Sequence, residues 1–113
     1  MTHPEAKWIY RSSNGIDLEC WCMLLEVSVR KWRTGYVKLP PGWPEGLSPE
    51  EVIRVHGGVT FDRDGVIGFD TAHGGDKFED WTLDLVKEET EHMAEQVALR
   101  VPGIINLIHS VEE

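Results

Sequence analysis

Two stretches of the chain hold its densest set of side chains that could do chemistry. The first supplies one histidine and two glycines, and the second supplies two aspartates and one histidine: His56, Gly57, Gly58, Asp70, His73 and Asp76. Imidazole and carboxylate groups hydrogen-bond polar ligands and can coordinate metals. Glycines beside them allow close approach of a ligand to the backbone, because no Cβ fills the space.

Three interpretations of these residues are open. In the first, they line a pocket for a small polar ligand, with Tyr36 or Trp43 as its apolar wall. In the second, the Asp-x-x-His-x-x-Asp spacing and the remote His56 supply donors for zinc, manganese or iron, although this spacing matches no established metal signature. In the third, the aspartates cap turns and His73 hydrogen-bonds backbone in a glycine-rich loop. We favour the ligand pocket, and we predict no metal ligands and no cofactor.

The first stretch lies on the first strand of a predicted β-hairpin, and the second stretch follows from its second strand. Residues 52–61 and 66–70 are rich in β-branched and aromatic side chains, and the four-residue connector between them ends in Asp-Gly. Such a connector favours a tight turn between antiparallel strands. Pairing outward from the turn places Gly57 and Gly58 opposite residues 69 and 70, and it brings His56 within reach of the second stretch.

Extended structure is also predicted near the N-terminus, at residues 8–11 and 18–39. The Ser-Ser-Asn-Gly sequence at 12–15 favours a tight turn between them, because Asn-Gly readily takes positive φ values. The Arg-Thr-Gly triplet at 33–35 indicates a second turn or a bulge.

A loop follows at residues 40–49, where four of the six prolines lie. Proline cannot donate the hydrogen bonds of a sheet, so this segment is not a strand. Trp43 within it either plugs the core or walls a ligand pocket. The loop ends in Ser48-Pro49, which matches the N-cap and first residue of a single helical turn.

The longest predicted helix runs from about residue 82 to residue 100, where apolar residues recur at the 3.6 period. The Pro-Gly pair at 102–103 ends it, and residues 104–111 favour a short terminal helix whose apolar side is core or a homo-oligomer contact. These elements predict a single α+β domain over residues 1–113. Its antiparallel sheet of about five strands packs against one long helix.

The formal charge of −9 is unevenly distributed, since residues 1–40 carry +2 and residues 41–113 carry −11. This acidity argues against binding of duplex nucleic acid, whose phosphates need Lys and Arg. The Arg-Lys-Trp-Arg cluster at 30–33 could still grip one phosphorylated small molecule, or it could be a solvated strand edge. The acidic run at 88–91 is a solvated helix face, a nucleic-acid mimic or a surface for a basic protein.

Other chemistries lack their motifs. The two cysteines, Cys20 and Cys22, form no disulfide framework and lack structural-zinc spacing, and free thiols fit a reducing compartment. No Gly-x-Ser-x-Gly elbow, P-loop or Gly-x-Gly-x-x-Gly sequence occurs. The chain has no apolar run near the roughly 18 residues of a membrane span and no apolar signal core at its start. We expect a cytoplasmic protein that does not associate with membranes.

Several short motifs occur in a fixed order within residues 33–97. They are Gly35-Tyr36-Val37, a Pro/Gly loop, His56-Gly57-Gly58-Val59-Thr60-Phe61 and Gly68-Phe69-Asp70-Thr71-Ala72-His73-Gly74-Gly75-Asp76, followed by an acidic helix. This order resembles a family of small uncharacterised phage and prophage proteins. The resemblance implies a viral or prophage accessory protein, and small proteins of that kind often bind a host protein or sequester a nucleotide signal used in immunity.

The sequence therefore favours a non-enzymatic binder of a small polar, nucleotide-like ligand, located in the host cytoplasm if the protein is viral. One alternative is a protein-interaction module or an inhibitor of a host protein that acts through the acidic helix. Another is a metal-dependent hydrolase. The arrangement of His56, Asp70, His73 and Asp76 bears on all three.

Overall fold

The computed structural model describes residues 3–101. It contains five strands and two helices: β1 (Ala6–Arg11), β2 (Asp17–Val27), β3 (Arg30–Lys38), α1 (Pro49–Val52), β4 (Phe61–Arg63), β5 (Val66–Asp70) and α2 (Leu83–Leu99). The terminal helix predicted at 104–111, and the oligomer contact that it could make, lie outside the described residues.

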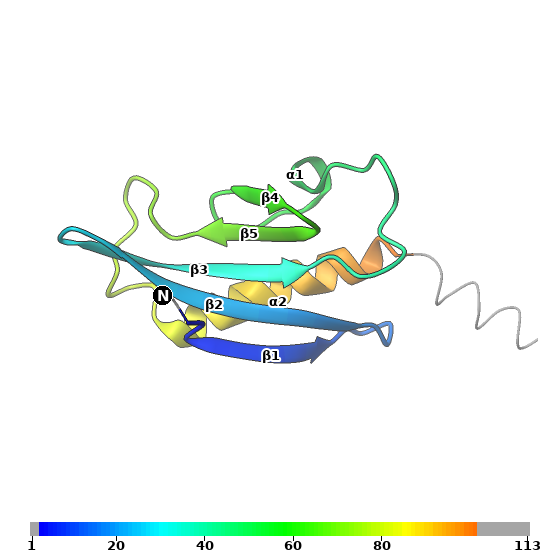
Figure 1. Ribbon diagram of the computed structural model, residues 1–113, viewed down its shortest axis with the longest axis horizontal. Coiled ribbons are helices and arrows are strands. Elements are labelled where there is room, and N and C mark those ends of the chain that lie inside the picture. Colours follow the sequence, from blue (N-terminus) through cyan, green and yellow to red (C-terminus); the bar gives the residue numbers. More distant parts are fainter. Residues whose placement is uncertain (1–2, 102–113) are drawn as a thin grey trace, which may run out of the picture.

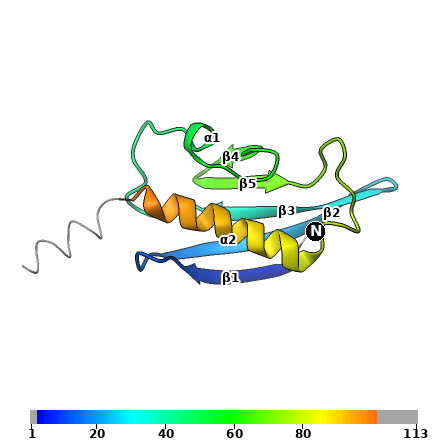
Figure 2. The same cartoon turned by 180° about the vertical axis from the view of Figure 1, so that it is seen from behind.

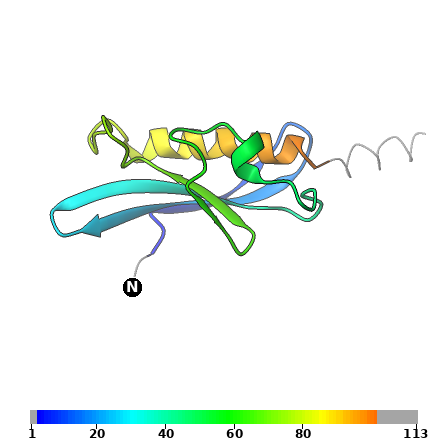
Figure 3. The same ribbon diagram turned by 90° about the horizontal axis from the view of Figure 1, so that it is seen from above.

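The five strands form one antiparallel sheet in the order β1-β2-β3-β5-β4. Helix α2 lies across one face of this sheet, where it contacts β2 and β3 (Figures 1 and 2). Helix α1 and the loop after it lie on the same side of the sheet as α2 (Figure 3). The predicted α+β architecture is confirmed. Neither described helix is both long enough and apolar enough to span a membrane.

The core lies between α2 and the sheet. It is formed by alternate residues of the strands and by residues of α2 that recur with the helical period. Alternate residues of β2, namely Leu18, Cys20 and Cys22, are buried. The buried residues of α2 recur every three or four positions: Val86, Thr90, Met93, Ala94, Val97 and Ala98. Both thiols are free, and burial raises their pKa to about 12 at Cys20 and about 11 at Cys22. Neither cysteine is therefore an activated nucleophile.

Gly35 lets α2 approach the middle of the sheet. A Cβ on this residue would lie 2.2 Å from the Thr90 hydroxyl oxygen and 2.5 Å from the Phe69 ring. The prediction of a turn or bulge at 33–35 is wrong, because β3 runs through these residues. Gly35 instead makes room for the side chains of Thr90 and Phe69. The chain reverses earlier, between β2 and β3, where Ser28 has a φ of 57°.

The second hairpin has a shorter first strand than predicted. Its turn is Asp64-Gly65, whose φ values of 53° and 77° are those of a type I′ turn. Phe61 consequently pairs with Gly68, two residues from the predicted register. Both registers leave each side chain on the same face of the sheet, because the shift is even.

Residues 53–60 form a loop, where the sequence predicted a continuous strand. Gly57 and Gly58 have φ values of 69° and 83°, so they break the extended backbone. The two glycines lie outside the ladder and do not pair with residues 69 and 70. His56 is therefore positioned by a loop and not by strand pairing.

Candidate functional site

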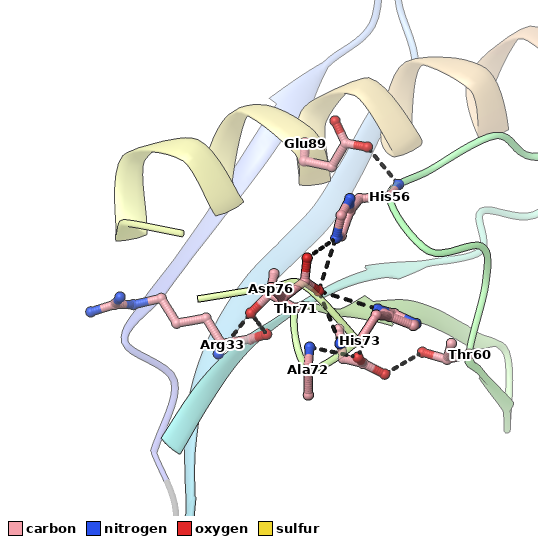
Figure 4. A network of polar contacts seen from close by, with 9 residues as sticks. Arg33, His56, Thr60, Thr71, Ala72, His73, Asp76 and Glu89 are labelled. Carbon is pink, nitrogen blue, oxygen red and sulfur yellow. Dashed lines mark hydrogen bonds and ion pairs between the residues drawn. The ribbon is translucent and has the colours of Figure 1, made fainter. Parts of the chain in front are cut away.

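The loop that carries His56 is fastened to α2. The backbone amide of His56 donates to Glu89 Oε2 at 2.7 Å. Two residues earlier, Arg54 and Gln96 exchange hydrogen bonds between backbone and side-chain amide at 2.7 and 2.6 Å. These contacts hold His56 beside the middle of the helix, on the helix side of the sheet (Figure 4).

The loop at residues 71–81 approaches His56 from the other side, and Arg33 on β3 anchors both of its ends. The Thr71 hydroxyl exchanges hydrogen bonds with the Arg33 backbone at 2.9 and 3.2 Å. The Arg33 guanidinium donates to the Trp81 carbonyl at 3.0 Å and pairs with Glu5 at 2.8 Å. The loop thus has a fixed start and a fixed end on one strand.

Asp76 is the centre of the site. Its carboxylate lies 2.9 and 3.0 Å from His56 Nε2, and it also accepts the His73 backbone amide at 2.9 Å (Figure 4). The Asp76 side chain is only 9% exposed. Burial alone raises the pKa of Asp76, but the hydrogen bonds from His56 and His73 outweigh it and lower the pKa below its ordinary value. Asp76 is therefore ionised at neutral pH.

His73 completes the arrangement. Its Nδ1 lies 3.4 Å from Asp70 Oδ1 and 3.4 Å from Asp76 Oδ2. Neither contact has hydrogen-bond geometry, and within residues 3–101 this buried nitrogen has no hydrogen-bond partner. The ring packs against Gly57, where a Cβ would lie 2.1 Å from His73 Cε1. Glycine is required at 57 both for its positive φ and for this contact.

Asp70 is held at the edge of the site. It accepts hydrogen bonds from the Thr60 hydroxyl and from the Ala72 amide, both at 3.0 Å. We refer to His56, Asp70, His73 and Asp76 as the histidine–aspartate cluster. The sequence predicted that these four residues converge, and the structure brings them together, with Gly57 in direct contact.

The other predicted site residues lie elsewhere or have local roles. Gly58 closes a turn by donating its amide to the Val55 carbonyl at 2.8 Å, and a Cβ added to it would meet open space. Trp43 packs against the core beneath its own loop and donates its indole N–H to the Leu47 carbonyl at 3.0 Å. Neither residue walls the cluster.

Tyr36 faces away from the cluster, on the side of the sheet that α2 does not cover. Its ring stacks on Trp21, with centroids 5.6 Å apart, and meets the edge of Phe61 at 5.4 Å. These three rings border a mainly apolar pocket of about 300 Å³. Alternation along β3 decides this placement, because Gly35 and Val37 on either side point toward α2.

A second pocket adjoins the cluster, and we call it the polar pocket. It has a volume of about 350 Å³, and His73 and Asp76 form part of its wall. Four further wall residues are cationic or aromatic, namely Arg30, Lys31, Trp32 and Phe78, and the remaining three are the small or aliphatic residues Val29, Thr71 and Ala72. Lys31 Nζ lies 5.3 Å from the Phe78 ring centroid, within cation–π distance.

Sequence reasoning missed three residues of the site. Trp81 packs on the His56 ring at 4.4 Å, Glu89 holds the His56 backbone, and Phe78 lines the polar pocket. The sequence gives little indication of these residues. Trp81 and Glu89 lie more than 15 positions along the chain from His56, and Phe78 lies in a loop without periodicity. The Arg-Lys-Trp-Arg cluster at 30–33, which the sequence offers as a phosphate grip or a solvated strand edge, has its first three residues on the pocket wall, while Arg33 pairs with Glu5 and Trp81.

The acidic helix uses several of its carboxylates within the molecule. Glu89 accepts from His56, Glu91 accepts the Trp8 indole N–H at 2.9 Å, and Glu95 accepts the Tyr10 hydroxyl at 2.8 Å. These side chains tie α2 to the neighbouring strand and loop.

Comparisons with protein-family models, with curated proteins and with solved structures found no match to this chain.

Proposed function

We propose that this protein is a non-enzymatic binder of a small anionic, nucleotide-like ligand, and that the polar pocket is its binding site. The observation that carries the proposal is the composition of the pocket wall. At the edge of β3 it brings two cation–aromatic pairs beside the histidine–aspartate cluster: Lys31 with Phe78 on the face toward α2, and Arg30 with Trp32 on the other face. A volume of about 350 Å³ falls in the range of small-molecule sites.

Each part of the wall has a chemical counterpart in such a ligand. Arg30 and Lys31 supply positive charge and N–H donors for a phosphate group. Trp32 and Phe78 supply rings for a planar base, which would join or displace the cations that lie over them, Arg30 over Trp32 and Lys31 and Arg33 over Phe78. Arg33 is less free to bind, because its guanidinium already contacts Glu5 and Trp81.

The negative charge of the whole chain does not oppose this proposal. Phosphate recognition at one site depends on the two or three cations nearest the ligand, and charges beyond about 10 Å are largely screened at ordinary ionic strength. The nearby Asp76 carboxylate faces donors on His56 and His73, which offset its charge. The resemblance to phage and prophage proteins supports an accessory role in which the bound ligand is sequestered rather than converted.

Calorimetric titration of the purified protein with AMP, ADP and ATP in the presence of EDTA tests the proposal. Adenosine and inorganic phosphate serve as probes for the base and the phosphate alone. We expect at least one nucleotide to bind, and we expect Lys31→Ala and Arg30→Ala each to weaken it about tenfold, the usual effect of losing a charged hydrogen bond. Lys38→Ala, an exposed lysine at the far end of β3, is the matched control.

The proposal fails if no nucleotide binds, or if Lys31→Ala and Lys38→Ala bind equally well. Binding of adenosine with the affinity of AMP would also overturn it, because the phosphate would then contribute nothing.

A further inference from the structure

We infer that His56, His73 and Asp76 form a binding site for one divalent transition-metal ion of the zinc type. This inference does not depend on the proposed nucleotide site. The two histidines and the aspartate come from the 53–60 loop and the 71–81 loop, and one donor atom of each lies within 4.8 Å of the other two. The sequence suggests the donor types but no recognised spacing, because the third donor comes from a distant loop.

The distances suit an ion of this size. Around a tetrahedral zinc ion with bonds of about 2.0–2.1 Å, neighbouring donor atoms stand about 3.3 Å apart. Asp76 Oδ2 lies 3.0 Å from His56 Nε2 and 3.4 Å from His73 Nδ1, and the donor atoms of the two histidines lie within 4.8 Å of each other. Small side-chain adjustments therefore admit an ion between the three donors.

The donor set selects the class of metal. Two imidazole nitrogens and one carboxylate oxygen favour zinc, iron, cobalt or nickel. Magnesium and calcium prefer oxygen donors and fit this set poorly. The set also leaves at least one coordination position open, as in zinc sites with three protein ligands. Two of the three proposed ligands, His73 and Asp76, also border the polar pocket.

The buried Nδ1 of His73 is an independent observation that points to a ligand. Within the described residues it makes no hydrogen bond, although two carboxylates stand 3.4 Å away. A buried polar atom without a partner is costly. Coordination of a metal ion gives this nitrogen a partner without any change of the fold.

The surrounding residues hold the three ligands in place, as the outer shell of a metal site does. The backbone amide of His73 fixes the Asp76 carboxylate at 2.9 Å, and Glu89 fixes the backbone of His56. Trp81 covers one side of the His56 ring, with ring centroids 4.4 Å apart. Figure 4 shows the side chain of His56 from one loop facing those of His73 and Asp76 from another.

Zinc chloride titrated into EDTA-treated and desalted protein, followed by calorimetry, tests the inference. We expect one ion per chain, and we expect His56→Ala and His73→Ala each to weaken binding at least about tenfold. His92→Ala is the matched control, because His92 is an exposed histidine on α2 outside the cluster. Absence of binding overturns the inference, and so does equal affinity in all three variants.

Asp76→Asn protects the test against variants that fail to fold. Asparagine keeps an oxygen for the His73 amide but lacks the charge, and circular dichroism verifies its fold. With cobalt(II) as the probe, the wild-type protein should show the intense visible absorption of a four- or five-coordinate ion, and Asp76→Asn should lose it. Identical spectra in both proteins would refute the site. The nucleotide titrations contain EDTA, so failure of either proposal leaves the other intact.

Discussion

Two carboxylates at different places in the molecule, Asp76 and Glu95, collect hydrogen bonds in the same way. Glu95 on α2 accepts the Tyr10 hydroxyl, the Ser13 amide and the Ser13 hydroxyl, and we call these three residues the Glu95 network. The Ser13 hydroxyl is the main cause of the lowered pKa of Glu95. At Asp76, hydrogen bonds also prevail over burial and lower the pKa.

The two networks differ in their donors and in their surroundings. The donors to Glu95 are hydroxyl and amide groups, and the hydrogen bond to Glu95 raises the pKa of Tyr10 to about 12, so these protons stay in place. The donors to Asp76 include the His56 imidazole, and a pocket adjoins Asp76 and His73. A lowered carboxyl pKa therefore does not mark a functional site on its own. The chemistry of the hydrogen-bond donors and a pocket beside them are better indications of such a site.

The largest expected effect tests how tightly the histidine–aspartate cluster is packed. Gly57→Ala should destabilise the protein by about 3 kcal/mol, because it adds left-handed strain and forces the His73 ring aside. Gly58→Ala is the matched control, since it has the same strain but open space, and it should lose only about 1 kcal/mol. Urea denaturation measures both. Equal losses would show that the contact between residue 57 and His73 does not matter.

The next effect compares the Glu95 network with the proposed binding sites. Glu95→Ala should cost about 2 kcal/mol of stability, because it leaves Tyr10 and Ser13 without their acceptor. Binding of zinc and of nucleotide should not change. Glu88→Ala, an exposed glutamate on the same helix, should stay within about 0.5 kcal/mol of wild type. A loss of binding in Glu95→Ala would break the distinction between the two networks.

Acid titration extends the same comparison. Because the folded-state pKa of Glu95 lies below its ordinary value, its hydrogen bonds stabilise the protein at neutral pH and are lost as the pH falls through the lowered pKa. Glu95→Gln should therefore lose less stability than wild type as the pH falls from 6 to 3. Urea midpoints at several pH values measure this. Parallel pH curves for both proteins would assign the acid sensitivity to other carboxylates.

Local patterns were sufficient to predict most of the fold. Asn14-Gly15 and Asp64-Gly65 both mark turns that the structure contains, and the apolar stripe of α2 predicted which face packs on the sheet. The turn at residues 28–29 could not be predicted, because Ser28-Val29 has no glycine or proline. The prediction of a turn at Gly35 is wrong because its packing partners, Thr90 and Phe69, are distant in sequence.

The candidate site was only partly predictable for a similar reason. The sequence indicated that His56 lies near residues 70–73, but for the wrong cause, because a loop fastened to Glu89 positions it and not strand pairing. For Tyr36 and Trp43, aromatic character was the only indication of a place in the site. Which face a strand residue occupies, and which loop lies over which, depends on tertiary contacts that no local pattern contains.

The smallest expected effect concerns one hydrogen bond of the Glu95 network. Tyr10→Phe removes the donor and keeps the ring, so it should cost about 1 kcal/mol in urea denaturation. In the wild type, ultraviolet titration should give a pKa of about 12 for Tyr10. Glu95→Gln should return this pKa toward the ordinary value, because the main cause of the shift is the hydrogen bond to Glu95. If Glu95→Gln left the titration of Tyr10 unchanged, the hydrogen bond between Tyr10 and Glu95 would not exist in solution. The Glu95 network would then cease to be the structural counterpart of the histidine–aspartate cluster.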